Sequence, residues 1–180
     1  VLPKGTECPE LEVTGADSVQ MDQRRAGDTT KGAFDDAMVC SANIPAGATS
    51  ARVTGVSIPA GMPKEAETIA ALADTGCRIK AAVQDCNSTT AWPFMPIAEQ
   101  IAKANPDLII HVGDYFYREL PCPAKDSTRC GGSPVPPTGV PFEDSAAGWD
   151  ADFFSPGQAM FGVAPILCTR GNHEVCSKGG

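Results

Sequence analysis

Three short apolar runs of this chain are each followed closely by a motif in which glycine stands beside an aspartate or an asparagine. The runs cover residues 68–73, 108–112 and 164–168, and the motifs are Asp74-Thr75-Gly76, Gly113-Asp114-Tyr115-Phe116-Tyr117 and Gly171-Asn172-His173-Glu174. Apolar runs of this length are typical of buried strands in a parallel sheet. Because the carboxyl ends of parallel strands meet at one edge of the sheet, we expect the three motifs to gather at one place.

The segments between these runs predict helices and loops. Residues 93–104 carry apolar side chains at a spacing that matches one face of a helix, and Asn105-Pro106 would end that helix. With a strand on either side, this predicts a βαβ unit. Residues 149–161 predict a second helix, interrupted at Ser155-Pro156-Gly157. The Pro- and Gly-rich stretch 119–148 predicts a long irregular loop.

The first 66 residues have a different character, with more polar residues and turn signals. Residues 51–58 are rich in β-branched side chains and lie between two turn-like tetrapeptides, which predicts one strand. We therefore interpret residues 1–66 as a small β-rich N-terminal region and residues 67–180 as a second unit. The expected fold class is mixed, α/β (α+β).

Eight cysteines are a large and even number for 180 residues. They lie at Cys8, Cys40, Cys77, Cys86, Cys122, Cys130, Cys168 and Cys176. No two form a Cys-x-x-Cys pair, which argues against a zinc ribbon or a thioredoxin-type motif and favours disulfides in an oxidising compartment, secreted or periplasmic. We predict that neighbours pair, as 8–40, 77–86, 122–130 and 168–176. The alternative is that some are free buried thiols.

Charge and hydropathy limit the partners. The net charge is −8 and the isoelectric point is near 4.7, so the chain lacks the basic surface that binding to nucleic acid needs. No apolar run approaches the roughly 18 residues of a membrane span. A small phosphorylated substrate remains compatible with an acidic protein, because bound metal ions invert the local field.

Two aspartates stand out as metal ligands. If Asp74 and Asp114 converge on one point, their carboxylates repel each other unless cations lie between them. A carboxylate can also bridge two metal ions at the roughly 3.5–4 Å spacing used in phosphoryl chemistry. The alternative is that each aspartate only caps a helix or forms a turn. The glycine and asparagine motifs that follow in order favour the metal site.

With these motifs the chain resembles the calcineurin-like metallophosphoesterases, and within them the purple acid phosphatase branch. That branch carries Asp-x-Gly, then Gly-Asp-x-x-Tyr, then Gly-Asn-His-Asp/Glu, and residues 74–76, 113–117 and 171–174 match all three patterns. The resemblance covers roughly residues 68–176. It implies a β-sandwich flanked by helices, with residues 67–180 as the first half of the catalytic domain.

The resemblance also implies a role for each matched residue. Asp74 and Tyr117 would bind the first metal, Asp114 would bridge both metals, and Asn172 would bind the second through its amide oxygen. His173 would lie beside the substrate phosphate and donate a proton to it or to the leaving oxygen. A hydroxide activated by the two metals would be the nucleophile.

The donor types suggest which metals bind. Phenolate and carboxylate ligands favour iron(III) at the first position, and the second position would suit iron(II), zinc or manganese. The alternative for Tyr117 is a packed ring whose hydroxyl bonds to a backbone carbonyl. Tyr115 is expected to point to the opposite face.

The chain departs from the family pattern in its histidines. The family has two further motifs downstream, Val-x-x-His and Gly-His-x-His, whereas this chain has only His111 and His173. We interpret His111 as a core histidine whose side chain faces away from Asp114. The metal ligands are therefore incomplete, and we expect this chain to be the first half of a longer protein, with weak metal binding on its own.

Two arginines are candidates for holding phosphate, Arg170 before the third motif and Arg78 after the first. The alternative for each is a surface salt bridge. A disulfide between Cys168 and Cys176 would tie down the third motif, and one between Cys77 and Cys86 would brace the first.

The function we predict is hydrolysis of phosphomonoesters by a two-metal mechanism, as in an acid phosphatase. One alternative is a catalytically incomplete fragment or pseudoenzyme that acts as a binding module. Another is phosphodiesterase or lipid-phosphate activity on the same fold.

Overall fold

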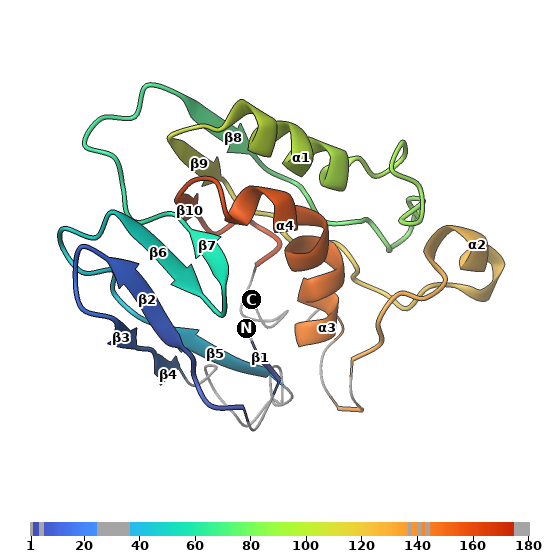
Figure 1. The fold of residues 1–180 in the computed structure, drawn as a ribbon. Coiled ribbons are helices and arrows are strands. Elements are labelled where there is room, and N and C mark those ends of the chain that lie inside the picture. Colours follow the sequence, from blue (N-terminus) through green and yellow to red (C-terminus); the bar gives the residue numbers. More distant parts are fainter. Residues whose placement is uncertain are drawn as a thin grey trace.

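The structure is a computed structural model that describes residues 2–3, 6–24, 37–136, 138–139, 142 and 145–174. Strands dominate the first third of the chain, and helices alternate with parallel strands in the rest (Figure 1). The strands are β1 Leu2–Pro3, β2 Glu10–Thr14, β3 Val19–Gln20, β4 Asp22–Arg24, β5 Ala37–Ser41, β6 Ser50–Val53, β7 Val56–Ile58, β8 Ile69–Leu72, β9 Leu108–His111 and β10 Ile166–Cys168. The helical segments are α1 Phe94–Ala104, η2 Ala124–Asp126, α2 Ser127–Cys130, α3 Ala146–Trp149, the π-helical η3 Asp150–Phe154, and α4 Ser155–Phe161.

The N-terminal strands form two small antiparallel sheets, in the orders β3-β2-β6-β7 and β1-β5-β4. The single strand predicted over residues 51–58 is wrong, because β6 and β7 are two strands of a hairpin. Thr54 and Gly55 at its tip have positive φ angles of 49° and 80°. A two-residue turn of this kind matches the twist of the flanking strands, so the chain reverses within a run that is rich in β-branched residues.

The predicted βαβ unit is confirmed. β8, α1 and β9 follow one another, and β9 is the middle strand of a three-stranded parallel sheet in the order β10-β9-β8. Helix α1 ends where expected: Asn105 takes a left-handed conformation with φ 47°, and its N–H caps the last carbonyls of the helix. The mixed α/β fold class is therefore confirmed.

Among the described residues, helices cover only one face of this parallel sheet. Ala70, Ile109 and Ile166 lie on the face that packs against the helices. On the other face Ile69 is 54% exposed and Leu167 is 53% exposed. The buried strand predicted for residues 68–73 is thus half-exposed, because β8 lies at the sheet edge with helices on one side only. Parallel sheets are normally covered on both faces.

The helical stretch near the C-terminal end runs without interruption from Ala146 to Phe161. The predicted break at Ser155-Pro156-Gly157 is wrong. The π-helical turn Asp150–Phe154 shifts the hydrogen-bond register, so Pro156 falls in the first turn of α4, where a missing N–H costs little. The 119–148 stretch also holds more helix than expected, in η2, α2 and the start of α3.

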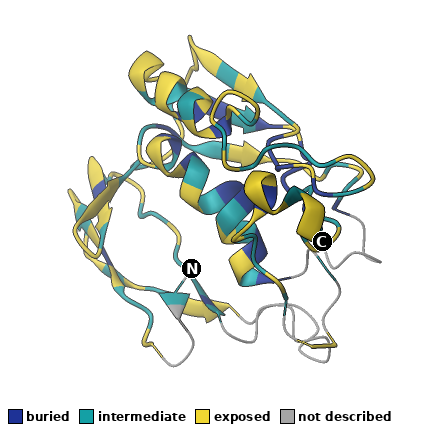
Figure 2. Ribbon diagram, turned by 90° about the vertical axis from the view of Figure 1, so that its right-hand side faces the viewer, coloured by how far each residue is buried: buried dark blue, intermediate teal, exposed yellow. Residues whose placement is uncertain are grey.

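The core lies between this helical stretch, α1 and the sheet. Its buried aromatic residues include Phe94, Tyr115 and Phe153, and Met160 fills the space beside them. In Figure 2 the dark blue of buried residues gathers on the helices and the loops around them, whereas the N-terminal strands are mostly teal and yellow.

Three of the predicted disulfides are confirmed: Cys8–Cys40, Cys77–Cys86 and Cys122–Cys130. Cys168 is exposed and has no disulfide partner among the described cysteines. Its predicted partner at position 176 lies outside the described residues, so the fourth bridge stays a prediction. Among the helices of the described residues, none has the length and apolar character to cross a membrane.

Candidate metal centre

Three loops meet at the carboxyl edge of the parallel sheet, as the order of the motifs predicted. Loop 1 (residues 74–76) follows β8, loop 2 (residues 113–117) follows β9, and loop 3 (residues 171–174) follows β10. Backbone hydrogen bonds join loops 1 and 2, from Asp74 N–H to Gly113 O at 3.2 Å and from Thr75 N–H to Asp114 O at 3.1 Å.

Glycines allow these loops to touch. A Cβ atom at Gly76 would lie 2.6 Å from the backbone nitrogen of Tyr117, which is too close for any side chain. A Cβ at Gly113 would collide with the backbone of Gly171. The glycine at position 76 therefore allows loop 2 to pack directly against loop 1.

Both candidate aspartates have strained backbones. Asp74 has φ 54° and Asp114 has φ 59°, in the left-handed region that residues with a Cβ rarely adopt. Strain of this kind persists where the surrounding structure enforces it, and it concentrates at functional sites. Here it turns two carboxylates from separate strands toward each other.

The hydroxyl of Tyr117 lies between these carboxylates. Its oxygen is 2.6 Å from Asp74 Oδ1 and 2.9 Å from Asp114 Oδ2. Burial and the hydrogen bonds to the two carboxylates raise the pKa of Tyr117 well above its ordinary value. The neutral phenol thus donates its one proton into the point where two anionic groups converge. The hydroxyl of Tyr117 therefore bonds to two carboxylates, and not to a backbone carbonyl as in the alternative considered for this residue.

Asp114 is the buried member of the pair, whereas Asp74 is exposed. Burial alone would raise the pKa of Asp114. The backbone N–H of His173, which donates to Asp114 Oδ1 at 2.8 Å, and the hydroxyl of Tyr117 outweigh that effect, so the pKa lies below its usual value. Asp114 therefore stays ionised in its buried position.

Loop 3 brings Asn172 and His173 to the same place. Asn172 is exposed, and its backbone N–H also favours ionised Asp114. The His173 ring lies over Tyr117, with the ring centres 4.3 Å apart. Its Nδ1 is 2.8 Å from Glu119 Oε1, although the two atoms lack the alignment of a hydrogen bond.

Glu119 is a site residue that sequence reasoning missed. The same oxygen that faces His173 also accepts a hydrogen bond from Lys80 Nζ at 2.9 Å. Lys80 in turn lies 5.1 Å from the centre of the Tyr117 ring. The one available signal was spacing, because Glu119 follows Tyr117 by two residues and can face the same side in an extended segment.

Glu174 is a second missed residue. It is buried, and its two oxygens accept three backbone hydrogen bonds, each 2.8 Å long: from Asp114, Tyr115 and Gly171. One carboxylate thus ties loop 3 to loop 2. The sequence held the residue inside a motif but gave no sign that its partners are main-chain groups.

His111 is a core histidine, as predicted. It is fully buried, its Nε2 lies 2.9 Å from Thr75 Oγ1, and its Nδ1 accepts from Gly113 N–H at 3.2 Å. Burial lowers its pKa to about 4, although Glu174 and the site aspartates pull the other way. Tyr115 points into the same core, stacked on His111 at 4.0 Å between ring centres, which confirms that it faces away from Tyr117.

The two candidate arginines both contact backbone. Arg170 donates through Nε to the carbonyl of Glu174 and so braces loop 3. Arg78 donates through Nε to the carbonyl of Ala82 at 3.3 Å. Their role in phosphate binding stays a prediction.

The oxygens at this edge fit a cation. Two carboxylates and a phenol converge within hydrogen-bond distance, and a cation placed among them would relieve the repulsion that the phenol proton now offsets. Within the described part of the chain, no three His, Cys, Asp or Glu side chains come together as a metal-binding group. The donors that converge here are instead two carboxylates and a phenol.

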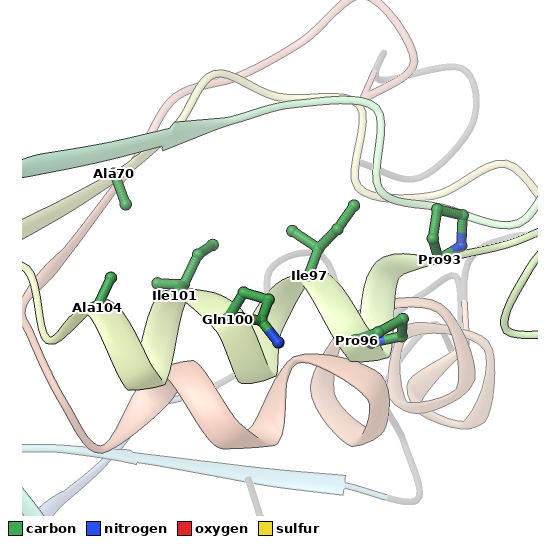
Figure 3. Close-up of a pocket in the computed structure, with 7 residues that line it drawn as sticks. All are labelled: Ala70, Pro93, Pro96, Ile97, Gln100, Ile101 and Ala104. Carbon is green, nitrogen blue, oxygen red and sulfur yellow. The ribbon is translucent and has the colours of Figure 1, made fainter.

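A separate groove of about 410 Å³ lies between helix α1 and the edge of β8 (Figure 3). Its lining is almost wholly apolar: Ala70, Pro93, Pro96, Ile97, Gln100, Ile101 and Ala104. In Figure 3 the side chains of Ile97 and Ile101 point toward the strand that carries Ala70. None of these residues belongs to the three loops, so the groove plays no part in the site.

Comparison with known proteins gives one result. The family model described as calcineurin-like phosphoesterase matches residues 68–179, which is more than half of the chain and includes all three loops. No individual curated protein matches. The family match implies a hydrolase of phosphate esters, and such enzymes typically use a centre of two metal ions. The chain belongs to the calcineurin-like phosphoesterase family.

Proposed function

We propose that this chain carries the phosphomonoesterase site of an acid phosphatase of the purple acid phosphatase type. One observation supports this most directly: the Tyr117 hydroxyl lies within 2.9 Å of both Asp74 and Asp114. A tyrosine in that position, together with glycine at position 76, is what separates the branch from relatives with a histidine there. Its substrate would be a small phosphorylated molecule.

In this proposal Asp74 and Tyr117 hold the first metal, Asp114 holds both, and Asn172 holds the second. Hard anionic oxygens favour iron(III) in the first position, with iron(II), zinc or manganese in the second. The metals, when bound, lower the pKa of water and polarise a phosphate oxygen. All other contributions come from the residues of the chain.

His173 is the proton donor. Its Nδ1 faces Glu119 Oε1 at 2.8 Å, a contact that orients the ring. That leaves Nε2 to donate to the leaving oxygen of the substrate. Lys80, 2.9 Å from the same Glu119 oxygen, offsets part of the negative charge of this carboxylate. The backbone N–H of His173 meanwhile holds Asp114.

Neither histidine of this chain supplies a nitrogen ligand to the metals in this proposal. His111 cannot contribute, because both of its ring nitrogens are engaged in the core. His173 is reserved for the substrate, and the sequence has no third histidine. The apolar face of the parallel sheet that carries Ile69 and Leu167 is where the second sheet layer of a β-sandwich would pack.

We also propose that the protein is exported. Three disulfides fit an oxidising compartment, which in practice means a secreted or periplasmic location. Disulfides Cys77–Cys86 and Cys122–Cys130 lie within the segment matched by the family model, so the catalytic part itself depends on oxidation.

A second candidate function is a binding module without turnover. The observation that favours it is the short supply of donors, with three side chains for one metal and two for the other. Such a protein would still bind phosphate or a partner through the same loops.

Metal loading followed by an activity assay separates the two. The chain, and a version extended at its C-terminus, are loaded with iron and zinc and assayed with an aryl phosphate at acid pH. Hydrolysis by the extended protein, with little from the shorter chain, supports the phosphatase. Metal binding without hydrolysis in either form supports the binding module.

The matched variants are Asp114→Asn and Asp107→Asn. Asp107 also holds backbone N–H groups, but it lies at the opposite end of β9. Asp114→Asn should lose both metals, whereas Asp107→Asn should keep them. Retention of both metals by Asp114→Asn would overturn the bridging role.

A further inference from the structure

Asp152 is a fully buried carboxylate that no motif includes. It lies in the π-helical segment Asp150–Phe154. Its Oδ2 accepts from the backbone N–H of Tyr117 at 3.1 Å, and its Oδ1 accepts from Arg118 Nε at 2.5 Å. The backbone N–H of Cys77 also donates to it. One side chain therefore contacts loop 2 and the residue that directly follows loop 1.

Arg118 extends these contacts. It is buried, it donates through Nη1 to Ser133 Oγ at 2.7 Å, and its guanidinium lies 5.4 Å from the centre of the Trp92 ring. Trp92 Nε1 in turn donates to Thr75 O at 2.8 Å, in the middle of loop 1. The Asp152–Arg118 pair thus contacts loop 2 at the backbone of Tyr117. It is linked to the region of loop 1 through Cys77, which follows that loop, and through Trp92, which bonds to Thr75.

We propose that Asp152 is a positioning residue that sets the distance of the Tyr117 hydroxyl from Asp74. The catalytic importance of this residue rests on the proposed function, because the position of the Tyr117 hydroxyl matters for catalysis if Tyr117 binds a metal. Glu174 holds the start of loop 2 at Asp114 and Tyr115. Asp152 is the side chain that holds its end, at the backbone nitrogen of Tyr117.

The position in a π-helical turn fits this role. A π-turn adds one residue to the helix and turns the following side chains by about a quarter of a circle, so such turns recur at functional sites. Here the turn places Asp152 against the backbone of loop 2, while its neighbour Phe153 packs in the aromatic core. A buried ion pair is a costly way to build a core, since apolar residues of similar size often do as well. That cost is explained if the pair has to fix the backbone of Tyr117, a proposed metal-binding residue.

The test compares Asp152→Asn with Asp107→Asn. Both aspartates accept hydrogen bonds from backbone N–H groups, but Asp107 lies at the end of the sheet away from the loops. An asparagine cannot accept through its nitrogen, so Asp152→Asn loses at least one of its three contacts. We expect amide exchange at Tyr117 to become roughly 10- to 100-fold faster in metal-free Asp152→Asn, with Asp114 unchanged.

The metal-loaded protein gives the second readout. In Asp152→Asn the visible tyrosinate-to-iron band should shift or weaken, and iron affinity should fall about 10- to 100-fold, as for other residues that support metal ligands. Asp107→Asn should keep the band and the affinity even if it unfolds more easily. An unchanged band, affinity and Tyr117 exchange in Asp152→Asn would overturn the positioning role.

Two further outcomes are distinguishable. If the wild-type protein gives no tyrosinate band at all, the proposed metal ligation fails, and Tyr117 exchange alone decides whether Asp152 positions the loop. If Asp152→Asn does not fold because Arg118 is left unpaired, the double variant Asp152→Asn/Arg118→Gln removes both buried charges. It should show the same fast exchange at Tyr117, and slow exchange there would again overturn the proposal.

Discussion

Oε2 of Glu174 accepts a hydrogen bond from the backbone N–H of Asp114 at 2.8 Å, although the two residues lie 60 positions apart in the chain. The same oxygen accepts from Gly171 N–H at the same distance. Loop 3 is thereby fastened to loop 2 through main-chain groups. Loop 3 also carries the backbone N–H of His173, which lowers the pKa of Asp114. The position of loop 3 therefore affects the charge of the site as well as its shape.

Glu174→Gln should therefore loosen the site. Its amide nitrogen cannot accept, so at least one of three buried N–H groups loses its partner. We expect the free energy of unfolding to fall by roughly 1–3 kcal/mol. Urea unfolding of the metal-free protein measures this. Glu119→Gln, whose carboxylate contacts the side chains of Lys80 and His173, is the control. An equal loss of stability in the two variants would contradict the role of Glu174 in fastening loop 3 to loop 2.

Tyr117→Phe should abolish the visible absorption of the iron-loaded protein, because no phenolate remains. Stability of the metal-free protein should fall by only about 1 kcal/mol, since one hydroxyl shared between exposed Asp74 and buried Asp114 is lost. Tyr115→Phe is the matched control, because Tyr115 faces the core. A band that survives in Tyr117→Phe and disappears in Tyr115→Phe would reverse the assignment.

Removing the Cys77–Cys86 disulfide by paired serine substitution should weaken both fold and site. A loop of this length predicts a loss of about 2–3 kcal/mol. Metal affinity should fall too, since Cys77 directly follows loop 1 and its N–H donates to Asp152. Paired substitution of Cys8 and Cys40, far from the loops in sequence, should leave affinity unchanged. Calorimetric titration with metal distinguishes the two.

His111 should make stability depend on pH. Burial holds its pKa at about 4 in the folded protein, below its ordinary 6.5. The unfolded chain therefore binds more protons between these values, and stability falls as the pH drops from 6.5 toward 4. His111→Gln, which does not titrate, should lose this part of the pH dependence. A difference between the two proteins that stays constant over that range would contradict the burial of a neutral imidazole.

Much of this architecture could be predicted from sequence. Helix α1 has a clear hydrophobic period and ends at Asn105, and strands β8, β9 and β10 lie in short apolar runs. The meeting of Asp74, Asp114 and His173 followed from the order of their motifs and from the geometry of parallel strands. Neighbouring cysteines also paired as expected in three cases.

Other features were misjudged for identifiable reasons. The β6–β7 hairpin was read as one strand because its turn residue Thr54 is itself β-branched. Pro156 suggested a helix break, since nothing in the pattern reveals a π-turn before it. The half-exposed face of β8 could not be foreseen, because an apolar run does not say which of its sides is covered.

The sequence by itself determined which residues reach the edge of the sheet: an aspartate, an aspartate with a tyrosine, and an asparagine with a histidine, each placed by a strand that ends there. Only the tertiary structure decided how they are held. Glu119, Asp152 and Glu174 each contact groups 34 or more positions away, such as Tyr117 N–H for Asp152. Hydrogen bonds of this kind have no period and no motif, because their partners are backbone or distant side-chain atoms that any sequence could supply.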